Sequence, residues 1–286
     1  MIGLGDVTSR LGLGGSETIS PTAHYTGYVW ARNGLSHPEL ETVEGRVLFE
    51  SLRPTMMVTG LVSGYALEPY LLARHRAIDT LLEEAIDRGE VGQVIEVAAG
   101  LSPRGWRFTR RHPELTYVEA DLADMAQRKR RALKRMGSLS DTHRVEVLDA
   151  LRDEGPQSIA ALADELDPEQ GLAIITEGLL GYLDGDSVDG VWRRFARTLE
   201  GFPHGRYISD LHLGDVQTVL IRGFRVVLSA FVRGRVHLHF QSAREAEAAL
   251  RDSGFVRAAV IPASEIVEVP PGPGGGLAHI LEASTT

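Results

Sequence analysis

The sequence predicts an α/β protein whose doubly wound, Rossmann-like sheet ends in an antiparallel hairpin. Two observations lead to this prediction. Short apolar strand patterns alternate with helical patterns through the last two-thirds of the chain, which is typical of a doubly wound sheet. The last two strand patterns then follow one another with no helical pattern between them, which indicates the hairpin. A helical N-terminal cap and a helical insertion complete the predicted fold.

The elements follow from apolar spacing and from the residues that end each run. The clearest helix covers 67–89, where Leu71, Ile78 and Leu82 recur at helical spacing and Gly89 ends the pattern. Pro103 fits the first turn of another helix, because its missing N–H is not needed there. The other predicted helices cover 122–136, 159–166, 186–199 and 243–253. Strands are predicted over 93–98, 116–120, 143–148, 172–176, 206–210, 255–261 and 277–282.

We expect two parts along the chain, an N-terminal helical cap on the substrate side over 1–65 and a cofactor-binding domain over 66–286. A helix is predicted to begin with Ser20 as its cap and Pro21 in its first turn. Tyr25 and Tyr28 follow on that helix and are predicted to bind substrate. Residues 45–62 have a mixed pattern, from which we assign neither a helix nor a strand.

Residues 212–240 interrupt the alternation with apolar helical runs broken by glycine. So much apolar surface beside a crevice predicts a lid over a hydrophobic substrate. His212, His237 and His239 fall in this stretch, but their spacing fits no compact ligand set, so we expect no metal.

The composition excludes several classes of protein. With 286 residues, 43% of them hydrophobic, the chain can build a sizeable core, and its net charge of -9 argues against a nucleic-acid partner. Two basic runs, 104–111 and 128–135, are interpreted as solvated faces of helices. The absence of cysteine excludes disulfides, thiolate catalysis and Cys-ligated zinc. No signal peptide is recognisable and the longest apolar run is too short to cross a membrane, so we expect a cytoplasmic protein with a small-molecule substrate.

A cofactor site is predicted at the end of the strand over 93–98. Ligands of an open α/β sheet bind outside the carboxyl ends of its strands, so the turn at 98–102 and Asp121 should share one crevice. Asp121 could accept both hydroxyls of a ribose. The turn has one glycine, Gly100, where a dinucleotide fingerprint has three. Glu96 points to where a phosphate would lie, and a carboxylate there suits an ammonium or a sulfonium. S-adenosylmethionine carries both.

Three further positions could belong to the same site. Arg74 or Arg76 could reach over the sheet edge and pair with the methionyl carboxylate of the cofactor. Asp149 ends a strand and could bind the adenine amino group or cap the next turn. Glu177 follows a buried strand, and a carboxylate there is costly unless something satisfies it, which favours a binding site.

These residues resemble one known family. The chain is similar to the leucine carboxyl methyltransferases, including the bacterial polyketide carboxyl O-methyltransferases, over about residues 20–285. The matching stretches are 20–23 (SPTA), 31–32 with 38–40 (AR and PEL), 73–79 (ARHRAID), 96–102 (EVAAGLS), 117–121 (YVEAD) with Lys129, and 176–183 (TEGLLGYL).

The resemblance implies a class I S-adenosylmethionine-dependent methyltransferase fold and a role for each matching residue. Arg74 would hold the cofactor carboxylate and Glu177 its amino end. Asp121 would hold the ribose, and Asp149 would lie on the adenine side.

The small-residue turn departs from the family pattern. Ala98 and Gly100 would contact the methionyl part, yet the turn usually reads Gly-Ala-Gly, and Ala98 replaces its first glycine. The next position is usually Asp and is Ser102 here. The first change should narrow the approach of the cofactor slightly.

The predicted function is O-methylation of a small-molecule carboxylate or phenol, of the kind found in polyketide-type secondary metabolism. A carboxylate acceptor needs no base, whereas a phenol needs one. The candidates are His24, His75, His212, His237 or a nearby carboxylate, and we single out His212 and Tyr182 as candidate catalytic residues. Tyr182 is also predicted to bind substrate.

Two other functions stay open from the sequence. A homologue that binds the cofactor but has lost methyl transfer would fit the changes at Ala98 and Ser102. A nicotinamide-dependent oxidoreductase would need a glycine-rich pyrophosphate turn, which this chain lacks.

Overall fold

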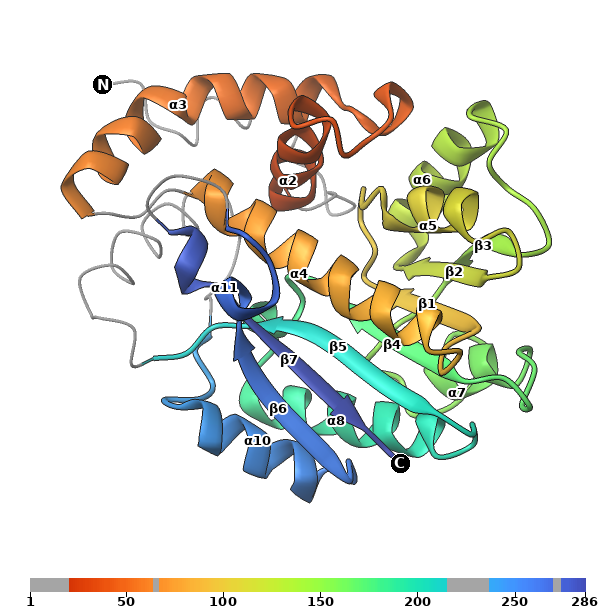
Figure 1. The fold of residues 1–286 in the computed structure, drawn as a ribbon. Helices are drawn as coiled ribbons and strands as arrows, with labels where there is room; N and C mark the ends of the chain where they lie inside the picture. The colour runs from red at the N-terminus through yellow and green to blue at the C-terminus, as the bar shows by residue number, and fades with distance from the viewer. Residues whose placement is uncertain (1–20, 64–66, 215–236, 270–273) are drawn as a thin grey trace.

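The computed structural model describes residues 21–63, 67–214, 237–269 and 274–286, with the backbone alone over 55–63. Its centre is a seven-stranded sheet in the order β3-β2-β1-β4-β5-β7-β6 (Figure 1). β1 to β5 are parallel, and β7 runs antiparallel to both of its neighbours, β5 and β6. This is the predicted doubly wound sheet with a terminal antiparallel hairpin.

The strands lie close to their predicted positions. Their bounds are β1 Gln93–Val97, β2 Thr116–Asp121, β3 His143–Val147, β4 Leu172–Thr176, β5 Gly205–Leu211, β6 Arg257–Pro262 and β7 His279–Ser284. The helices are α2 Pro21–Arg32, α3 Val43–Ser63, α4 Leu67–Asp87, α5 Arg104–Arg111, α6 Ala123–Arg135, α7 Ile159–Ala163, α8 Gly185–Leu199, α10 Ala243–Asp252 and α11 Ala263–Ile266.

The register of the central strands sets their carboxyl ends level with one another. Val97 of β1 lies opposite Ala120 of β2 on one side and Thr176 of β4 on the other. Since the next residues along β2 and β4 are Asp121 and Glu177, this register brings both carboxylates to one edge of the sheet, where the turn after β1 also begins.

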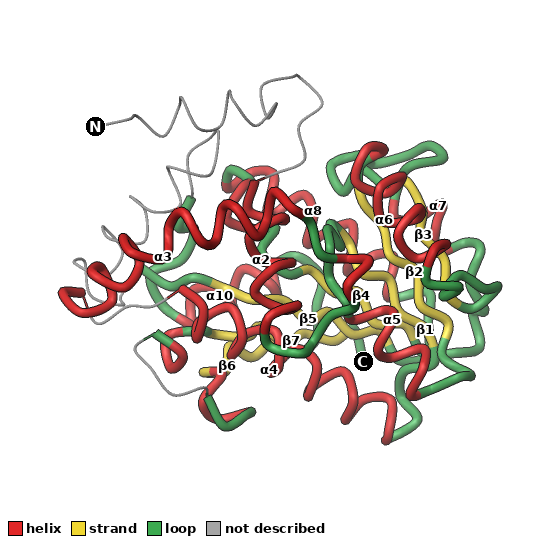
Figure 2. Tube along the Cα trace, turned by 90° about the horizontal axis from the view of Figure 1, so that it is seen from above, coloured by secondary structure: helices red, strands yellow, loops and turns green. Residues whose placement is uncertain are grey.

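The sheet separates two hydrophobic layers because successive side chains of a strand point to opposite faces. Val94 of β1 packs in the cluster that contains α2, α3 and α4, and Ile95 packs in the cluster that contains α7, α8 and α10. Seen from above, the strands run through the middle of the molecule with helices on both sides (Figure 2). The predicted cap helices therefore share a core with the sheet.

Two regions differ from the prediction. Residues 45–62, which had no assignment, fall in the long helix α3, which contains Pro54. The expectation that no helix separates the last two strands is wrong, because α11 lies between them; it has four residues, too few for helical periodicity to show in the sequence. A 3₁₀ turn, Gly275–Leu277, also delays the start of β7 to His279.

Some predictions concern residues outside the described ranges. They are the Ser20 cap, the Gly- and Ser-rich end before it, and most of the insertion, 215–236. None of the helices in the described ranges combines the length and apolar character that crossing a bilayer requires.

Candidate functional site

A cavity of about 510 Å³ opens at the carboxyl ends of β1, β2, β4 and β5. Its walls come from α2 and α4, the turns after β1, β2 and β4, the residues after β5, and His237 with His239. The volume falls in the range of about 300–1,000 Å³ that ligand pockets occupy. Its position is the one that an open α/β sheet uses for ligands.

The turn after β1 has an unusual backbone. Ala98 has φ +55° and Gly100 has φ +51°, and Ala98 is the single non-glycine residue with positive φ among the described residues. A left-handed conformation costs a residue with a Cβ roughly 1–2 kcal/mol. The turn therefore keeps the shape that a glycine would adopt freely, with a methyl group on the cavity wall.

Asp121 joins this turn to the end of β2. Its Oδ2 accepts a hydrogen bond from Gly100 N at 2.8 Å, and its Oδ1 accepts one from Leu122 N at 2.8 Å. Burial raises the pKa of this carboxyl above its usual value. Each carboxylate oxygen has two lone pairs, so Asp121 keeps acceptor capacity toward the cavity that it lines.

Glu96 lies on the cavity wall, but both of its oxygens have protein partners. It is 1% exposed, its Oε1 pairs with Arg104, and its Oε2 accepts a hydrogen bond from Tyr117 OH at 2.8 Å. The structure thus brings Glu96, Asp121 and Glu177 to one cavity, with the charge of Glu96 already matched by a guanidinium.

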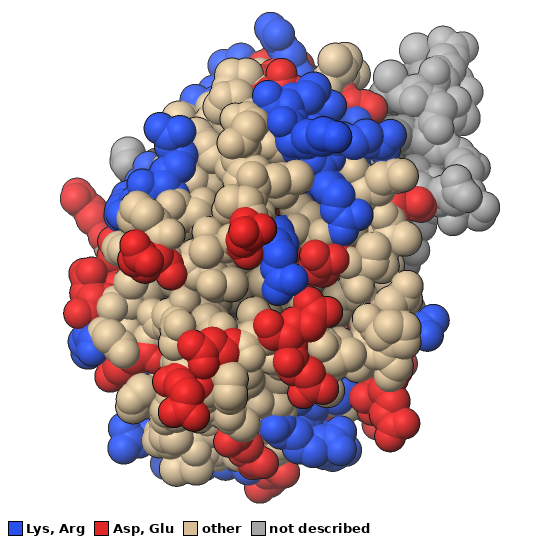
Figure 3. Space-filling model, turned by 90° about the vertical axis from the view of Figure 1, so that its right-hand side faces the viewer, with Lys and Arg blue, Asp and Glu red and all other residues tan. Residues whose placement is uncertain are grey.

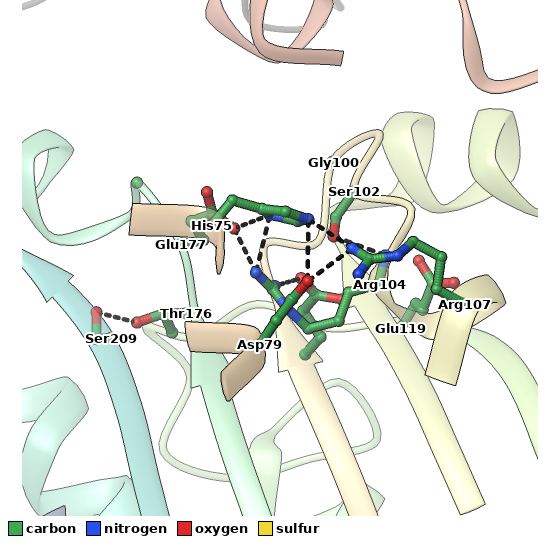
Figure 4. A network of polar contacts seen from close by, with 12 residues as sticks. His75, Asp79, Gly100, Ser102, Arg104, Arg107, Glu119, Thr176, Glu177 and Ser209 are labelled. Atoms are coloured by element: carbon green, nitrogen blue, oxygen red, sulfur yellow. Dashed lines mark hydrogen bonds and ion pairs between the residues drawn. The ribbon is translucent and has the colours of Figure 1, made fainter. Parts of the chain in front are cut away.

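Arg104, the first residue of α5, connects three carboxylates beneath the cavity (Figure 4). It is fully buried, and its Nε lies 2.6 Å from Asp79 Oδ1 and its Nη2 2.7 Å from Glu177 Oε2, while Nη1 pairs with Glu96. The carboxylates raise its pKa well above the usual value. The sequence analysis missed this residue, because it interpreted 104–111 as a solvated face; that interpretation is wrong for Arg104. The sequence held one signal for a buried Arg104, which is its position just after Pro103, next to the turn that follows the first strand of the sheet.

Glu177 receives three cationic or polar partners, which explains how a carboxylate is tolerated after a buried strand. Arg74 Nε lies 3.0 Å from its Oε1, and His75 Nδ1 and Arg104 Nη2 lie 2.8 and 2.7 Å from its Oε2. These neighbours hold the pKa of Glu177 well below its usual value.

Arg74 also reaches the end of β5. Its Nη1 lies 3.0 Å from Asp210 Oδ2, and Asp210 Oδ1 accepts a hydrogen bond from Gly178 N at 2.6 Å. Arg74 lines the cavity, whereas Arg76 of the same helix is not among its described lining residues.

A second buried cluster supports the turn from below. Lys129 of α6 pairs with Glu119 of β2 and donates to Ser102 O, and His143 Nε2 lies 2.8 Å from Glu119 Oε1. Gly105 is required here, because a Cβ at its position would lie 2.5 Å from Glu119 Oε1. The interpretation of 128–135 as a solvated face is therefore wrong for Lys129, although Arg131, Lys134 and Arg135 are exposed. Figure 3 shows basic side chains gathered toward the top of one face and acidic ones below them.

Part of the cavity wall is mainly aromatic, and it adjoins the ion network, because the Arg74 guanidinium lies 5.8 Å from the centre of the Tyr70 ring. Tyr25 and Trp30 of α2, Tyr70 of α4 and Tyr182 all line the cavity, with Tyr182 39% exposed. Tyr28, predicted to bind substrate, packs its ring 5.3 Å from that of Phe49 and is not among the described lining residues.

Three imidazoles complete this wall. His212 Nε2 lies 2.8 Å from Tyr70 OH, and burial lowers the pKa of His212 to about 4. The rings of His237 and His239 stack 5.9 Å apart, and His239 Nε2 lies 3.0 Å from Leu180 O. Within the described part of the chain, no group of three His, Cys, Asp or Glu side chains is arranged to hold a metal ion.

The remaining candidates lie elsewhere. Asp149 Oδ1 accepts a hydrogen bond from Leu151 N at 3.0 Å and its Oδ2 lies 3.5 Å from Arg152 Nε, which are the contacts of a turn cap. His24 is buried with its Nδ1 2.9 Å from Thr42 Oγ1. Neither Asp149 nor His24 is among the described residues that line the cavity.

The sheet order, with its antiparallel β7, and the acidic cavity at the strand ends define a Rossmann-like methyltransferase fold. The chain belongs to the leucine carboxyl methyltransferase family, which it matches over residues 50–196.

Two curated relatives share the name "putative S-adenosyl-L-methionine-dependent methyltransferase". One, from Mycolicibacterium gilvum, is 38% identical over 121 residues, which are 42% of this chain and 38% of the relative. The other, from Mycobacterium tuberculosis, is 34% identical over 108 residues, which are 38% of this chain and 35% of the relative. The chain therefore matches less than two-fifths of the length of each.

Solved structures share the fold across nearly the whole chain. A putative methyltransferase from Thermobifida fusca superposes with a TM-score of 0.65 at 15% identity, covering 95% of this chain and 96% of the other. A DUF574 family protein from Streptomyces avermitilis superposes with a TM-score of 0.61 at 14% identity, covering 93% and 97%.

Proposed function

We propose that this protein is a cytoplasmic S-adenosylmethionine-dependent O-methyltransferase that acts on a small-molecule carboxylate or phenol, in polyketide-type secondary metabolism. The observation that carries the proposal is the acidic cavity at the strand ends, which joins the turn after β1, Asp121 and Glu177 in one place. Family membership and the names of the curated relatives support the same activity.

The lining residues suit the chemistry of this cofactor. A sulfonium and an ammonium are cations, and most of the charged side chains among the described lining residues are carboxylates, which favour cations. We assign the ribose hydroxyls to Asp121 and the methionyl carboxylate to Arg74, with Glu177 on the side of the amino group. Ala98 and Gly100 would border the methionyl part. When bound, the cofactor supplies a methyl group activated by the sulfonium.

The contribution of the protein is to position the two reactants and to exclude water. Holding reactants in line can supply about 7–11 kcal/mol of the barrier reduction in favourable cases. In this proposal residues 1–65 form the substrate-side cap, 66–286 the cofactor-binding domain and 212–240 a lid. Tyr25 and Tyr182, on the aromatic wall, would contact the acceptor.

The strained turn favours one alternative, a homologue that binds the cofactor but no longer transfers its methyl group. Ala98 replaces a glycine and keeps positive φ, which places a methyl group where the family leaves space. In that case cofactor binding would survive and turnover would not.

Isothermal titration with S-adenosylmethionine and S-adenosylhomocysteine tests the proposal. We expect saturable binding of both and none of NAD. Absence of binding at high micromolar cofactor would contradict the proposal. Transfer of labelled methyl groups to a pool of acids and phenols then separates a working transferase from a protein that only binds.

A further inference from the structure

His75 of α4 lies beneath the cavity and has no role in the function proposed above. Its side chain is fully buried and it is not among the described lining residues, so it cannot take a proton directly from an acceptor in the cavity. Its Nδ1 lies 2.8 Å from Glu177 Oε2, and its Nε2 lies 3.3 Å from Arg107 Nη1 (Figure 4). The imidazole therefore contacts residues that support the site.

The contact between His75 and Glu177 fixes the position of a proton. Burial alone would raise the pKa of Glu177, but His75, Arg104 and Arg74 hold it well below its usual value. The carboxylate is therefore ionised at neutral pH and only accepts hydrogen bonds. An unprotonated Nδ1 would face Glu177 Oε2 with one lone pair against another, so Nδ1 carries a proton and donates it to this oxygen.

The two oxygens of Glu177 have different partners. Oε2 accepts from His75 Nδ1 and, at 2.7 Å, from Arg104 Nη2. Among the described contacts, Oε1 accepts from Arg74 Nε alone, at 3.0 Å. A carboxylate oxygen has about two acceptor sites, so Oε2 is fully used and Oε1 keeps one. Because Glu177 lines the cavity, the bond from His75 helps to set which acceptor site Glu177 offers to a ligand, and at what angle.

Trp30 of α2 packs against the imidazole of His75. The two ring centres lie 4.7 Å apart, with the ring planes inclined by 39°. Trp30 is 5% exposed and lines the cavity. In a closely packed interior, contact with so large a ring restricts the rotation of its neighbour. A side chain on the cavity wall thus reaches Glu177 through one intervening residue.

We propose that His75 is a positioning residue for Glu177, that Trp30 keeps His75 in place, and that these contacts set the affinity for the amino end of the cofactor. This inference rests on the proposed methyltransferase function, in which Glu177 lies on the side of the amino group. When His75 no longer holds Oε2, Glu177 can turn and the ammonium loses a well-directed acceptor. The adenosine part, which we assign to Asp121, does not depend on this bond.

Two ligands separate positioning from a merely structural role. S-adenosylhomocysteine carries the amino-acid end, whereas 5′-methylthioadenosine lacks it. Titration calorimetry gives both Kd values for the wild type and for His75→Leu, which removes the Nδ1 donor. We expect His75→Leu to weaken S-adenosylhomocysteine by about ten-fold or more and 5′-methylthioadenosine by less than about two-fold. Equal losses for both ligands, or no loss for S-adenosylhomocysteine, would overturn the proposal. A wild type that binds neither ligand would instead reject the proposed function.

A conservative variant and a matched control keep the test independent of folding. The amide nitrogen of Asn is bonded to Cγ as Nδ1 is, so His75→Asn should bind S-adenosylhomocysteine within about three-fold of the wild type. His75→Gln, whose amide nitrogen lies one bond further out, should show the selective loss even if His75→Leu does not fold. His24→Leu changes another buried histidine outside the described lining residues, and it should leave the ratio of the two Kd values within about two-fold. A loss in His75→Asn equal to that in His75→Gln would overturn the proposal.

A double-mutant cycle tests the contribution of Trp30. Trp30→Leu removes the ring that packs on His75 and should weaken S-adenosylhomocysteine by about three-fold or more. If both residues act through Glu177, the double variant should bind within about two-fold of His75→Leu alone, because residues in one chain of contacts are not additive. Additive losses, or unchanged affinity in Trp30→Leu, would overturn the link from Trp30 to Glu177.

Discussion

Two parts of the cavity wall differ in the contacts that hold their side chains in place. The strand-end wall holds charged side chains in fixed pairs, with Arg74 and Arg104 shared among carboxylates from α4, β1, β4 and β5. The adjoining aromatic part of the wall is made of tyrosines, a tryptophan and histidines, with His212 hydrogen-bonded to Tyr70. The charged part of the wall suits a ligand whose charge and shape do not vary. The aromatic part suits a ligand that is recognised by its aromatic rings.

This difference indicates which wall can change without loss of the fold. Partners in the ion network are far apart in the sequence, as Arg104 and Glu177 are, so removing one leaves buried charges unmatched. The aromatic wall depends mostly on packing, which tolerates volume-conserving changes. Four predictions test the contrast.

The largest expected effect is on the strand-end wall, with Arg104→Met. Removing one partner of a buried ion pair costs about 3–5 kcal/mol, and here three carboxylates lose their shared cation. Urea denaturation should show the loss. The matched control is Arg111→Met on the same helix, whose exposed pair with Glu83 should contribute about 0–1 kcal/mol. Equal effects of the two substitutions would contradict the contrast.

A smaller effect is expected from Asp121→Asn, which should weaken S-adenosylhomocysteine binding by about 10–100-fold. Hydrogen bonds to a charged group contribute about 1.5–3 kcal/mol, and the amide replaces one acceptor oxygen by a donor. Titration calorimetry measures the change. Asp153→Asn, an exposed residue paired with Arg194, is the control and should bind as the wild type does. Unchanged affinity in Asp121→Asn would remove Asp121 from the site.

Acid should destabilise the N-terminal helices through the buried imidazole of His24, which makes no described contact with the ion network at the strand ends. Burial of His24 in α2 lowers its pKa to about 4 from 6.5. The unfolded chain therefore binds this proton first as the pH falls, and stability that is present above pH 6.5 is lost between pH 6.5 and 4. We expect a loss on the order of 2 kcal/mol between pH 7 and 4.5 that His24→Gln lacks. Parallel pH profiles of wild type and variant, from urea denaturation, would contradict this.

The smallest effect concerns the turn. Ala98→Gly should raise the free energy of unfolding by about 1 kcal/mol, because glycine adopts positive φ without a steric penalty. It should also bind the cofactor slightly tighter. Ala99→Gly, one residue along and without positive φ, should change stability in the opposite direction. Destabilisation by Ala98→Gly would show that the Ala98 methyl group contributes packing that outweighs the strain.

The sequence predicted the sheet and the strand-end carboxylates because both depend on local pattern. A short apolar strand followed by an acid identified Asp121 and Glu177, and parallel pairing places such acids at one edge. It singled out Arg74, but as a partner of the cofactor carboxylate and not of Glu177 and Asp210, and it did not predict the other buried cations. Arg104 and Lys129 lie in basic runs that resemble surface helices, and their partners are set by tertiary contacts.

Other positions were ambiguous for the same reason. Asp149 ends a strand as Asp121 does, and only the direction of its loop separates a turn cap from a cavity residue. Tyr28 lies three residues after Tyr25 on α2 and both rings pack against Phe49, yet of the two only Tyr25 is among the described residues that line the cavity. Helical spacing alone does not distinguish the two.

The two ends of the 215–236 segment are tied together beside the cavity. Leu213 forms a bridge with Phe240, Gly214 N donates to Phe240 O at 2.9 Å, and His237 N donates to Gly181 O at 2.9 Å. Because these contacts join the two flanks directly, the positions of Leu213 and Phe240 are set by each other and by the neighbouring turn, not by the length of chain between them. His237 and His239 are therefore anchored at the rim of the cavity, and contacts between backbone groups would keep them there if their side chains were exchanged.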